Sequence, residues 1–300
     1  MPYDLSKYLV VGISSRALFD LSRENEIFEQ QGLEAYTAYQ RENESRVLDP
    51  EAGFPLIKAI LNLNNLGDKE RKTEVIIMSR NSADTSLRIF NSISHYGLDI
   101  TRAALAGGES LAPYLSAFKV DLFLSKSEED VQAAVDAGVA AAYVYDSHPD
   151  YSQNIEQIRI AFDGDAVLFS EESELVYQRD GLSAFLEHER QNANKPLHEG
   201  PFAKLLKTLS HLQHGMGLAK PPIRTALVTA RNSPAHERVI RTLREWNVRV
   251  DEAFFLGGVP KDEVLRAFGA HIFFDDQDIH CKPAAAMVPS ARVPYRTRQE

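Results

Sequence analysis

Short apolar runs alternate along this chain with longer segments whose apolar positions recur every three or four residues. The apolar runs fall at 8–13, 75–78 and 120–124 in the first half, and at 158–162, 225–228 and 271–274 in the second. The segments with helical spacing are 33–43, 54–64, 83–96 and 110–118, followed by 182–192, 201–212, 234–246 and 260–268. Strands that alternate with helices build βαβ units around a parallel sheet. The pattern predicts an α/β fold in which parallel sheets are flanked by helices.

The two halves of the chain match each other when one is shifted by about 150 residues. "GLEAYTAYQREN" (32–43) matches "GLSAFLEHERQN" (181–192), and two later blocks share an Arg-Asn-Ser core and a Gly-Gly turn. Three blocks in the same order indicate duplication of one domain. We therefore expect two tandem Rossmann-like halves, at 1–148 and 155–300, joined by a polar linker at 146–156.

Polar residues close the apolar runs of the second half. Asp163 and Asp165 follow the first run, Thr229 ends the second, and Asp275 and Asp276 end the third. Lys261 follows a Gly-Gly turn at the start of the next helix. Because ligands of open parallel sheets bind beyond the carboxyl ends of the strands, these residues are expected to converge on one edge. Another helix is predicted to begin at Ser233-Pro234, with serine as the cap and proline at the first helical position.

These residue types are typical of metal-assisted phosphoryl transfer. Asp163 can attack phosphorus and carry the phosphoryl group, while Asp165 exchanges protons with the leaving oxygen and with water. Thr229 and the amide of Ala230 can hold phosphate at a helix N-terminus, together with Lys261. Several carboxylates in one place require a cation, and Mg²⁺ prefers such hard oxygen ligands. Each signal alone is weak, since Asp-x-Asp pairs are mostly solvated turns; their order and placement together favour the functional interpretation.

The motifs "FDGDAVLF", "LVTARNS", "GGVPKDEVL" and "IFFDDQ" resemble the haloacid dehalogenase superfamily of phosphohydrolases. With "ISSRALFDL", "FDGDAVLFSEESE", "GPFAKLL" and "HIFFDD", the chain from about Tyr8 to Tyr295 is more specifically similar to the cytosolic type I 5'-nucleotidase family. That resemblance implies Mg²⁺-dependent hydrolysis of nucleoside 5'-monophosphates, AMP and deoxynucleotides among them. It also implies a metal held by Asp163, the backbone carbonyl of Asp165 and one of the final pair, with Asp276 favoured over Asp275. Substrate choice would lie in a helical cap at about 172–220.

Other functions stay open at this stage. A phosphatase of the same mechanism could act on another small phosphomonoester, and a nucleotide-binding regulator could retain only vestigial activity. Asp163, Asp165, Lys261 and Asp276 are all intact, which argues against the regulator.

The first half of the chain lacks the acidic residues that form the predicted site of the second half. The positions that match the site hold Ser14, Arg16, Met78, Leu111, Ser125 and Lys126. With every acid replaced, this half is expected to be catalytically inactive, and its simplest role is as a scaffold. The alternative is an effector site in which Arg16, Arg80 and Lys126 bind the phosphate of a nucleotide. The nucleotide activation known for type I nucleotidases makes such a site plausible.

The composition limits which binding partners and which cellular compartment we expect for this protein. The net charge of −10, from 43 acidic and 33 basic residues, gives no basic footprint for nucleic acid. The single cysteine excludes an internal disulfide framework, and no apolar run reaches the length of a membrane span. We expect a soluble cytoplasmic protein that binds nucleotides and neither nucleic acid nor membranes; the sequence leaves a homo-oligomer open.

Overall fold

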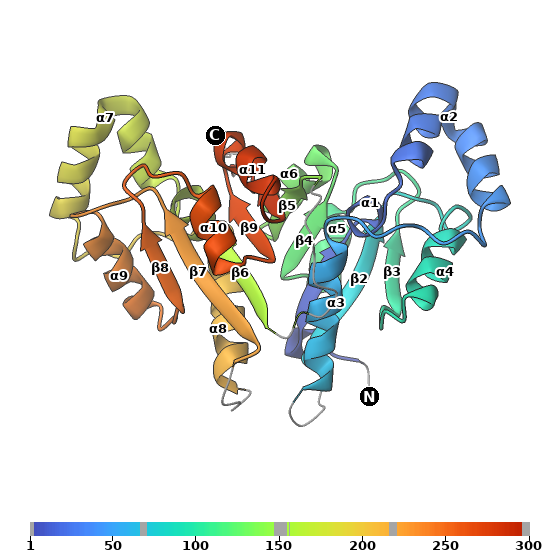
Figure 1. Cartoon of the computed structure of the whole chain (residues 1–300), viewed down its shortest axis with the longest axis horizontal. Coiled ribbons are helices and arrows are strands. Elements are labelled where there is room, and N and C mark those ends of the chain that lie inside the picture. Colours follow the sequence, from blue (N-terminus) through green and yellow to red (C-terminus); the bar gives the residue numbers. More distant parts are fainter. Residues whose placement is uncertain (1–2, 67–70, 147–154, 156, 216–220, 296–300) are drawn as a thin grey trace. The chain divides into compact units, whose positions relative to one another are not determined.

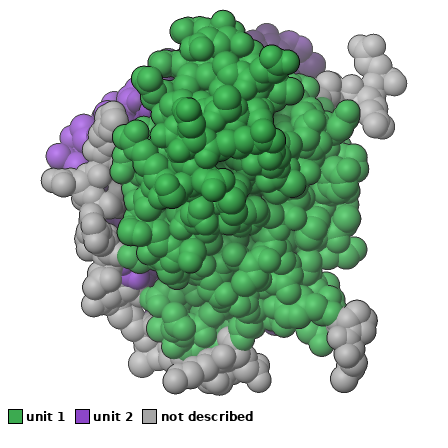
Figure 2. Space-filling view, turned by 90° about the vertical axis from the view of Figure 1, so that its right-hand side faces the viewer, with its two compact units in different colours: residues 1–139 green, residues 140–300 purple. Residues whose placement is uncertain are grey.

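The computed structural model describes residues 3–66, 71–146, 155, 157–215 and 221–295. It divides into two compact units, 1–139 and 140–300, coloured separately in Figure 2. The boundary precedes the predicted linker at 146–156, most of which lies outside the described residues. Among the described residues, none of the helices has both the length and the apolar character that crossing a bilayer requires.

Unit 1 is built on four parallel strands in the order β3-β2-β1-β4 (Figure 1). The strands are β1 (Leu9–Ile13), β2 (Thr73–Ser79), β3 (Arg102–Leu105) and β4 (Leu122–Ser125). The helices are α1 (Ser15–Leu18), α2 (Ser22–Glu42), α3 (Phe54–Asn62), α4 (Leu87–His95), α5 (Ala112–Ala117) and α6 (Glu128–Asp136). Strands β1, β2 and β4 are buried along their whole length, as expected of strands in a parallel sheet covered by helices.

Unit 2 has the strand order β5-β10-β9-β6-β7-β8, parallel except where β5 meets β10. Its strands are β5 (Ala140–Val144), β6 (Ile158–Phe162), β7 (Ile223–Thr229), β8 (Glu252–Phe255), β9 (Ile272–Asp275) and β10 (Ser290–Arg292). Its helices are α7 (Glu172–Gln191), α8 (Ala203–Gly215), α9 (His236–Glu245), α10 (Asp262–Phe268) and α11 (Asp278–Ala285). The predicted α/β fold, with mostly parallel strands flanked by helices, is confirmed.

An aromatic cluster lies directly behind the polar ends of β6 and β9. Phe162, the last residue of β6, stacks on Phe274 of β9 with ring centroids 5.6 Å apart. Phe202 packs on Phe274 at 4.8 Å, and all three rings are fully buried. Because buried aromatic rings pack closely and bury large areas, this cluster fixes the backbone that carries the next residues of both strands, Asp163 and Asp275.

The two helices of the predicted cap differ in burial. Helix α8 begins directly after Phe202 and buries Ala203, Leu205, Leu206 and Leu209, so it belongs to the core. Helix α7 buries only Ser173, Phe185 and Glu189 and is bent at Gly181, whose φ of 80° is favourable only for glycine. Figure 1 shows the two arms of α7 meeting at that bend. The part of the predicted cap that stands outside the core is therefore α7.

One predicted helix start is wrong. Helix α9 begins at His236 rather than at Ser233-Pro234, and no side chain caps it. Residues 233–235 form a turn instead, closed by the His236 N–H, which donates to the Asn232 carbonyl at 3.1 Å. The local preference of Ser233 and Pro234 for a helix start does not decide the structure here, because the chain forms a turn after β7 before the helix begins.

Candidate active site

Lys261 joins two of the predicted acids. Its Nζ donates to Asp163 Oδ1 at 2.8 Å and to Asp275 Oδ2 at 2.6 Å, and all three side chains are buried. Burial alone would lower the pKa of Lys261, but the attraction of Asp163 and Asp275 outweighs it and holds the pKa above its ordinary value. The ammonium is therefore a fixed positive charge between the ends of β6 and β9.

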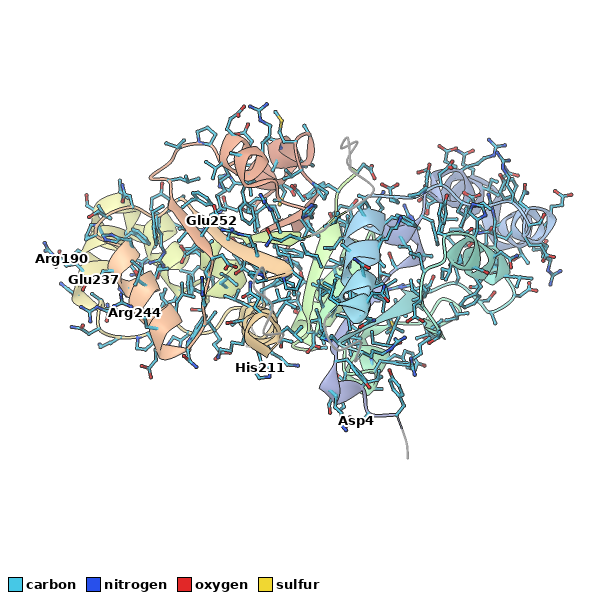
Figure 3. All side chains as sticks on the ribbon, turned by 60° about the horizontal axis from the view of Figure 1, so that its bottom comes forward. Asp4, Arg190, His211, Glu237, Arg244 and Glu252 are labelled. Atoms are coloured by element: carbon cyan, nitrogen blue, oxygen red, sulfur yellow. The ribbon has the colours of Figure 1, made fainter. Side chains whose placement is uncertain are left out.

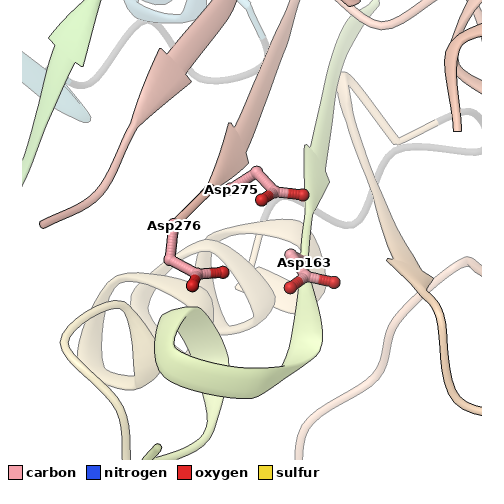
Figure 4. Close-up of side chains that lie close together, drawn as sticks. All are labelled: Asp163, Asp275 and Asp276. Atoms are coloured by element: carbon pink, nitrogen blue, oxygen red, sulfur yellow. The ribbon is translucent and has the colours of Figure 1, made fainter. Parts of the chain in front are cut away.

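Three buried carboxylates face one another at this point (Figure 4). One oxygen atom from each of Asp163, Asp275 and Asp276 lies within 4.8 Å of the others. Burial raises the pKa of Asp163 to about 6, against the opposing pull of Lys261 and with help from Asp275. Burial, with the charges of Asp163 and Asp275, raises the pKa of Asp276 to about 8. The cluster carries more negative charge than Lys261 can balance, which favours a bound cation.

Asp276 has an oxygen available for that cation. Its Oδ2 accepts a hydrogen bond from the Tyr295 hydroxyl at 2.6 Å, whereas Oδ1 is buried and has no partner among the described residues. Asp275 differs, because Lys261 takes its Oδ2 and the Gln277 N–H donates to its Oδ1 at 2.9 Å. Carboxylate oxygens of Asp163 and Asp276 are hard donors, and they fit Mg²⁺.

The second predicted acid, Asp165, points to a different partner. Arg231 Nη2 donates to its Oδ1 at 2.6 Å and Arg231 Nε to its Oδ2 at 2.7 Å. Arg231 is itself buried, and the negative charges of Asp165 and Glu189 raise its pKa despite the opposing effect of burial. Such a planar two-point contact fixes the orientation of the carboxylate as well as its position.

Thr229 lies at the end of β7, beside the turn that follows β6. Its Oγ1 accepts the backbone N–H of Arg231 at 3.2 Å, and a Cβ at Gly164 would come within 3.3 Å of that oxygen. The backbone at Gly164 can approach Thr229 so closely because glycine has no side chain. Thr229 thus adjoins the Asp163–Asp165 turn, while the roles of Thr229 and Ala230 as phosphate ligands stay predictions.

The predicted effector residues lie in unit 1. Arg80 pairs with Asp130 at 2.6 Å and with Glu129 at 3.1 Å, and Lys126 pairs with Glu51 at 3.0 Å. Arg16 is exposed. Two of the three cations therefore already have carboxylate partners, so an effector phosphate would have to compete with them.

Sequence reasoning missed Arg231, Glu189 and Tyr295. Arg231 stands two residues after Thr229 in the quoted motif, and its place behind a strand end could have marked it. Nothing in the sequence marks Glu189, because it lies on a helix with many other acids and its burial depends on tertiary packing.

Comparison with known proteins gives matches of three kinds. A family model described as 5'-nucleotidase matches residues 1–300. Human cytosolic 5'-nucleotidase 1B is 38% identical over 286 residues, which cover 92% of this chain and 47% of that protein. The chain thus spans about half the length of this curated relative. A solved structure, of the Pnkp1/Rnl/Hen1 complex, aligns over 97% of both chains with 12% identity and a TM-score of 0.34, which is too low to inform the fold.

Proposed function

The chain belongs to the 5'-nucleotidase family, and from this premise we propose that it hydrolyses nucleoside 5'-monophosphates, AMP and deoxynucleotides among them, to nucleoside and phosphate. The observation that carries the proposal is the meeting of Asp163 with Lys261, Asp275 and Asp276 in one buried cluster. A solvated pair of turn acids would not be buried around a lysine. Clustered groups with shifted pKa values are typical of catalytic sites.

In the first step, Asp163 is the nucleophile. Lys261 occupies its Oδ1, and Oδ2 accepts no hydrogen bond among the described residues, so Oδ2 is the oxygen available to attack phosphorus. Attack forms the aspartyl-phosphate and breaks the bond between phosphorus and the 5' oxygen of the nucleoside. Asp165 gives that oxygen a proton as it leaves.

In the second step, water replaces the aspartate. Asp165, now ionised, takes a proton from the water as it attacks phosphorus, and the bond to Asp163 breaks to release phosphate. Thr229, the Ala230 amide and Lys261 hold the phosphoryl oxygens throughout. Arg231 holds Asp165 in the orientation that this step requires.

Asp163, the backbone carbonyl of Asp165 and Asp276 would hold Mg²⁺, with Asp276 favoured over Asp275 by its unpartnered Oδ1. When bound, the ion supplies positive charge that offsets the carboxylates and the phosphate. We further propose that the protein acts in the cytoplasm and that nucleotides are its ligands.

The proposal extends to an origin of the two units by duplication. Their elements follow the same order, and their strands pair in the same register, since Ile13 faces Ile77 as Phe162 faces Leu227. That register places Ser79, and not Met78, at the position of Thr229. Ser79 Oγ accepts the Asn81 N–H at 3.2 Å, as Thr229 Oγ1 accepts that of Arg231. Unit 1 keeps this turn without the acids, which supports a scaffold, with an effector site at Arg16, Arg80 and Lys126 as the alternative.

A substrate panel tests the function. Phosphate release is measured with Mg²⁺ on AMP, dCMP, a sugar phosphate and p-nitrophenyl phosphate, each with and without ADP, ATP or GTP. The proposal predicts that the nucleotides are hydrolysed with the highest kcat/KM. Faster hydrolysis of the sugar phosphate would identify the protein as a phosphatase of other small esters, and no release from any ester would reject the activity.

A further inference from the structure

Glu189 is a fully buried acid that connects three separate parts of unit 2. Its Oε2 accepts from Arg231 Nη1, in the loop after β7. Its Oε1 accepts from Arg238 Nη1 of α9 at 3.0 Å and from the Ser173 hydroxyl at 2.8 Å. Ser173 lies in the first arm of α7 and Glu189 in the second, so this carboxylate also ties the two arms together across the bend at Gly181.

The buried face of α9 is part of this arrangement. Arg238 points inward, whereas Glu237 and Arg244 of the same helix lie on its exposed face (Figure 3). Arg238 also donates through Nε to the Lys195 carbonyl at 2.9 Å. A buried arginine with several partners is a rigid support, because its guanidinium offers donors in a fixed plane.

Arg231 carries the connection from Glu189 to the reacting groups. Nη1 faces Glu189, while Nε and Nη2 hold both oxygens of Asp165. The guanidinium also lies 5.2 Å from the centre of the Phe185 ring, on the same arm of α7 as Glu189. All three nitrogens of the guanidinium are hydrogen-bonded, and one of its faces lies near the Phe185 ring. The position of Arg231 therefore depends on the position of Glu189.

Unit 1 has a counterpart of the Arg238–Glu189 pair. In the part of unit 1 that the structure describes, the contact between Arg231 and Asp165 has no counterpart. Arg88 donates to the Arg46 carbonyl at 2.8 Å and pairs with buried Glu24, as Arg238 does with Lys195 and Glu189. The positions of Glu189 and Arg231 hold Gln40 and Asn81, and that of Asp165 holds Arg16. A buried Arg–Glu pair therefore occurs in both units, whereas among the described residues the further link from that pair to an acid is found only in the unit with Asp165.

We propose that Glu189 is a positioning residue for phosphate ester hydrolysis, acting through Arg231 on the orientation of Asp165; this rests on the function proposed above. Helix α7, through Glu189, then sets where the acid–base group points. Misplacing a reacting group by about 1 Å can cost up to about 100-fold in rate. The link therefore governs kcat, whereas substrate binding depends on other residues.

The first test is Glu189→Gln, which keeps the shape and removes the charge that holds Arg231. We expect kcat on AMP to fall about 10- to 100-fold, with KM within about threefold of wild type. Glu189→Asp keeps the charge and withdraws it by one methylene, so kcat should fall while the protein remains folded. This second variant decides the question if Glu189→Gln does not fold.

Two controls separate positioning from stability. Arg238→Gln breaks the same Arg238–Glu189 pair but leaves Arg231 in place, and Glu24→Gln removes the buried acid that pairs with Arg88 in unit 1. Both should lower Tm, and both should keep at least about half of the wild-type kcat. The inference is overturned if Glu189→Gln and Glu189→Asp stay within twofold of wild-type kcat, or if Arg238→Gln lowers kcat as much as Glu189→Gln. Measuring the same ratios with p-nitrophenyl phosphate keeps this result independent of which ester is the natural substrate.

Discussion

The guanidinium of Arg231 meets the carboxylate of Asp165 edge to edge, with N–O distances of 2.6 and 2.7 Å. Both oxygens of the proposed acid–base residue are thus engaged by one buried side chain. One of them must be freed toward the leaving oxygen during the first step, whereas the second step can use the carboxylate as it lies. The strength and shape of this pair should therefore affect turnover directly.

Arg231→Lys tests the shape of the contact. Lysine keeps the positive charge but cannot make the two-point contact, so Asp165 loses its fixed orientation. We expect kcat to fall about tenfold, with a smaller change in KM, in steady-state phosphate release. An unchanged kcat would mean that a positive charge is sufficient at this position and that the two-point contact with Asp165 is not needed.

Lys261→Met tests the balance of charge around Asp163. Methionine fills similar space but leaves the carboxylates of Asp163, Asp275 and Asp276 without their buried cation. Breaking a buried pair in this way costs about 3–5 kcal/mol of unfolding free energy. Urea unfolding in EDTA should show that loss, and MgCl₂ should restore part of it. A loss below about 1 kcal/mol would contradict the assigned charge balance.

Asp276→Asn tests the proposed metal ligand. Adding Mg²⁺ should raise the Tm of the wild type by about 4–8 °C at about 100 times its Kd, because a ligand that binds only the folded state stabilises it by about 2.7 kcal/mol. The variant should lose most of that rise. In EDTA it should melt above the wild type, since one of the mutually repelling buried acids is gone. Asp278→Asn, at an exposed acid two residues later, is the matched control and should keep the Mg²⁺ response.

His271 provides a pH prediction away from the site. Its Nδ1 accepts the backbone N–H of Arg159 at 2.9 Å, and burial with the charge of Arg159 lowers its pKa to about 4. Between pH ~6.5 and ~4 the unfolded chain binds a proton that the folded chain does not. Stability from this group is therefore fully present above pH ~6.5 and is lost as the pH falls toward 4.

The variant His271→Asn keeps an acceptor and removes the titration. In unit 1, Asp121 Oδ2 accepts the Val10 N–H at 3.0 Å in the same register, so a shorter acceptor fits this position. Urea unfolding at pH 7.5 and 5.0 should show a smaller difference for the variant than for the wild type. Between pH 7.5 and 5.0 the contribution of His271 is at most about 2 kcal/mol, and it is smaller than that because solvent screens a partly exposed ring. Equal differences in the two proteins would show that His271 does not contribute.

The sequence predicted the parts of this site that depend on strand order. Asp163 and Asp275 end neighbouring parallel strands and Lys261 follows a Gly-Gly turn, so their convergence follows from topology, and the structure brings them into contact. The sequence does not predict that Asp276 Oδ1 has no hydrogen-bond partner among the described residues, because this depends on the position of Tyr295, which binds the other oxygen.

Features that depend on side-chain packing are harder to predict from the sequence. The Ser233-Pro234 signal was local and gave a helix start that the turn at 233–235 overrides. The sequence offers Arg80 as a possible ligand of an effector phosphate, but it does not predict that Asp130 of α6 pairs with it. Glu189 looked like any acid on a polar helix, and only the packing of α7 against α9 makes it a buried connection.

The proposed role of Asp163 is that of the nucleophile in a phosphomonoesterase acting on nucleotides. Its decisive test is phosphate release from AMP with Mg²⁺, compared between wild type and Asp163→Asn, with circular dichroism to establish that both are folded. We expect steady turnover by the wild type and a rate indistinguishable from the enzyme-free reaction for the variant. A folded Asp163→Asn protein that keeps a substantial fraction of wild-type activity would contradict it.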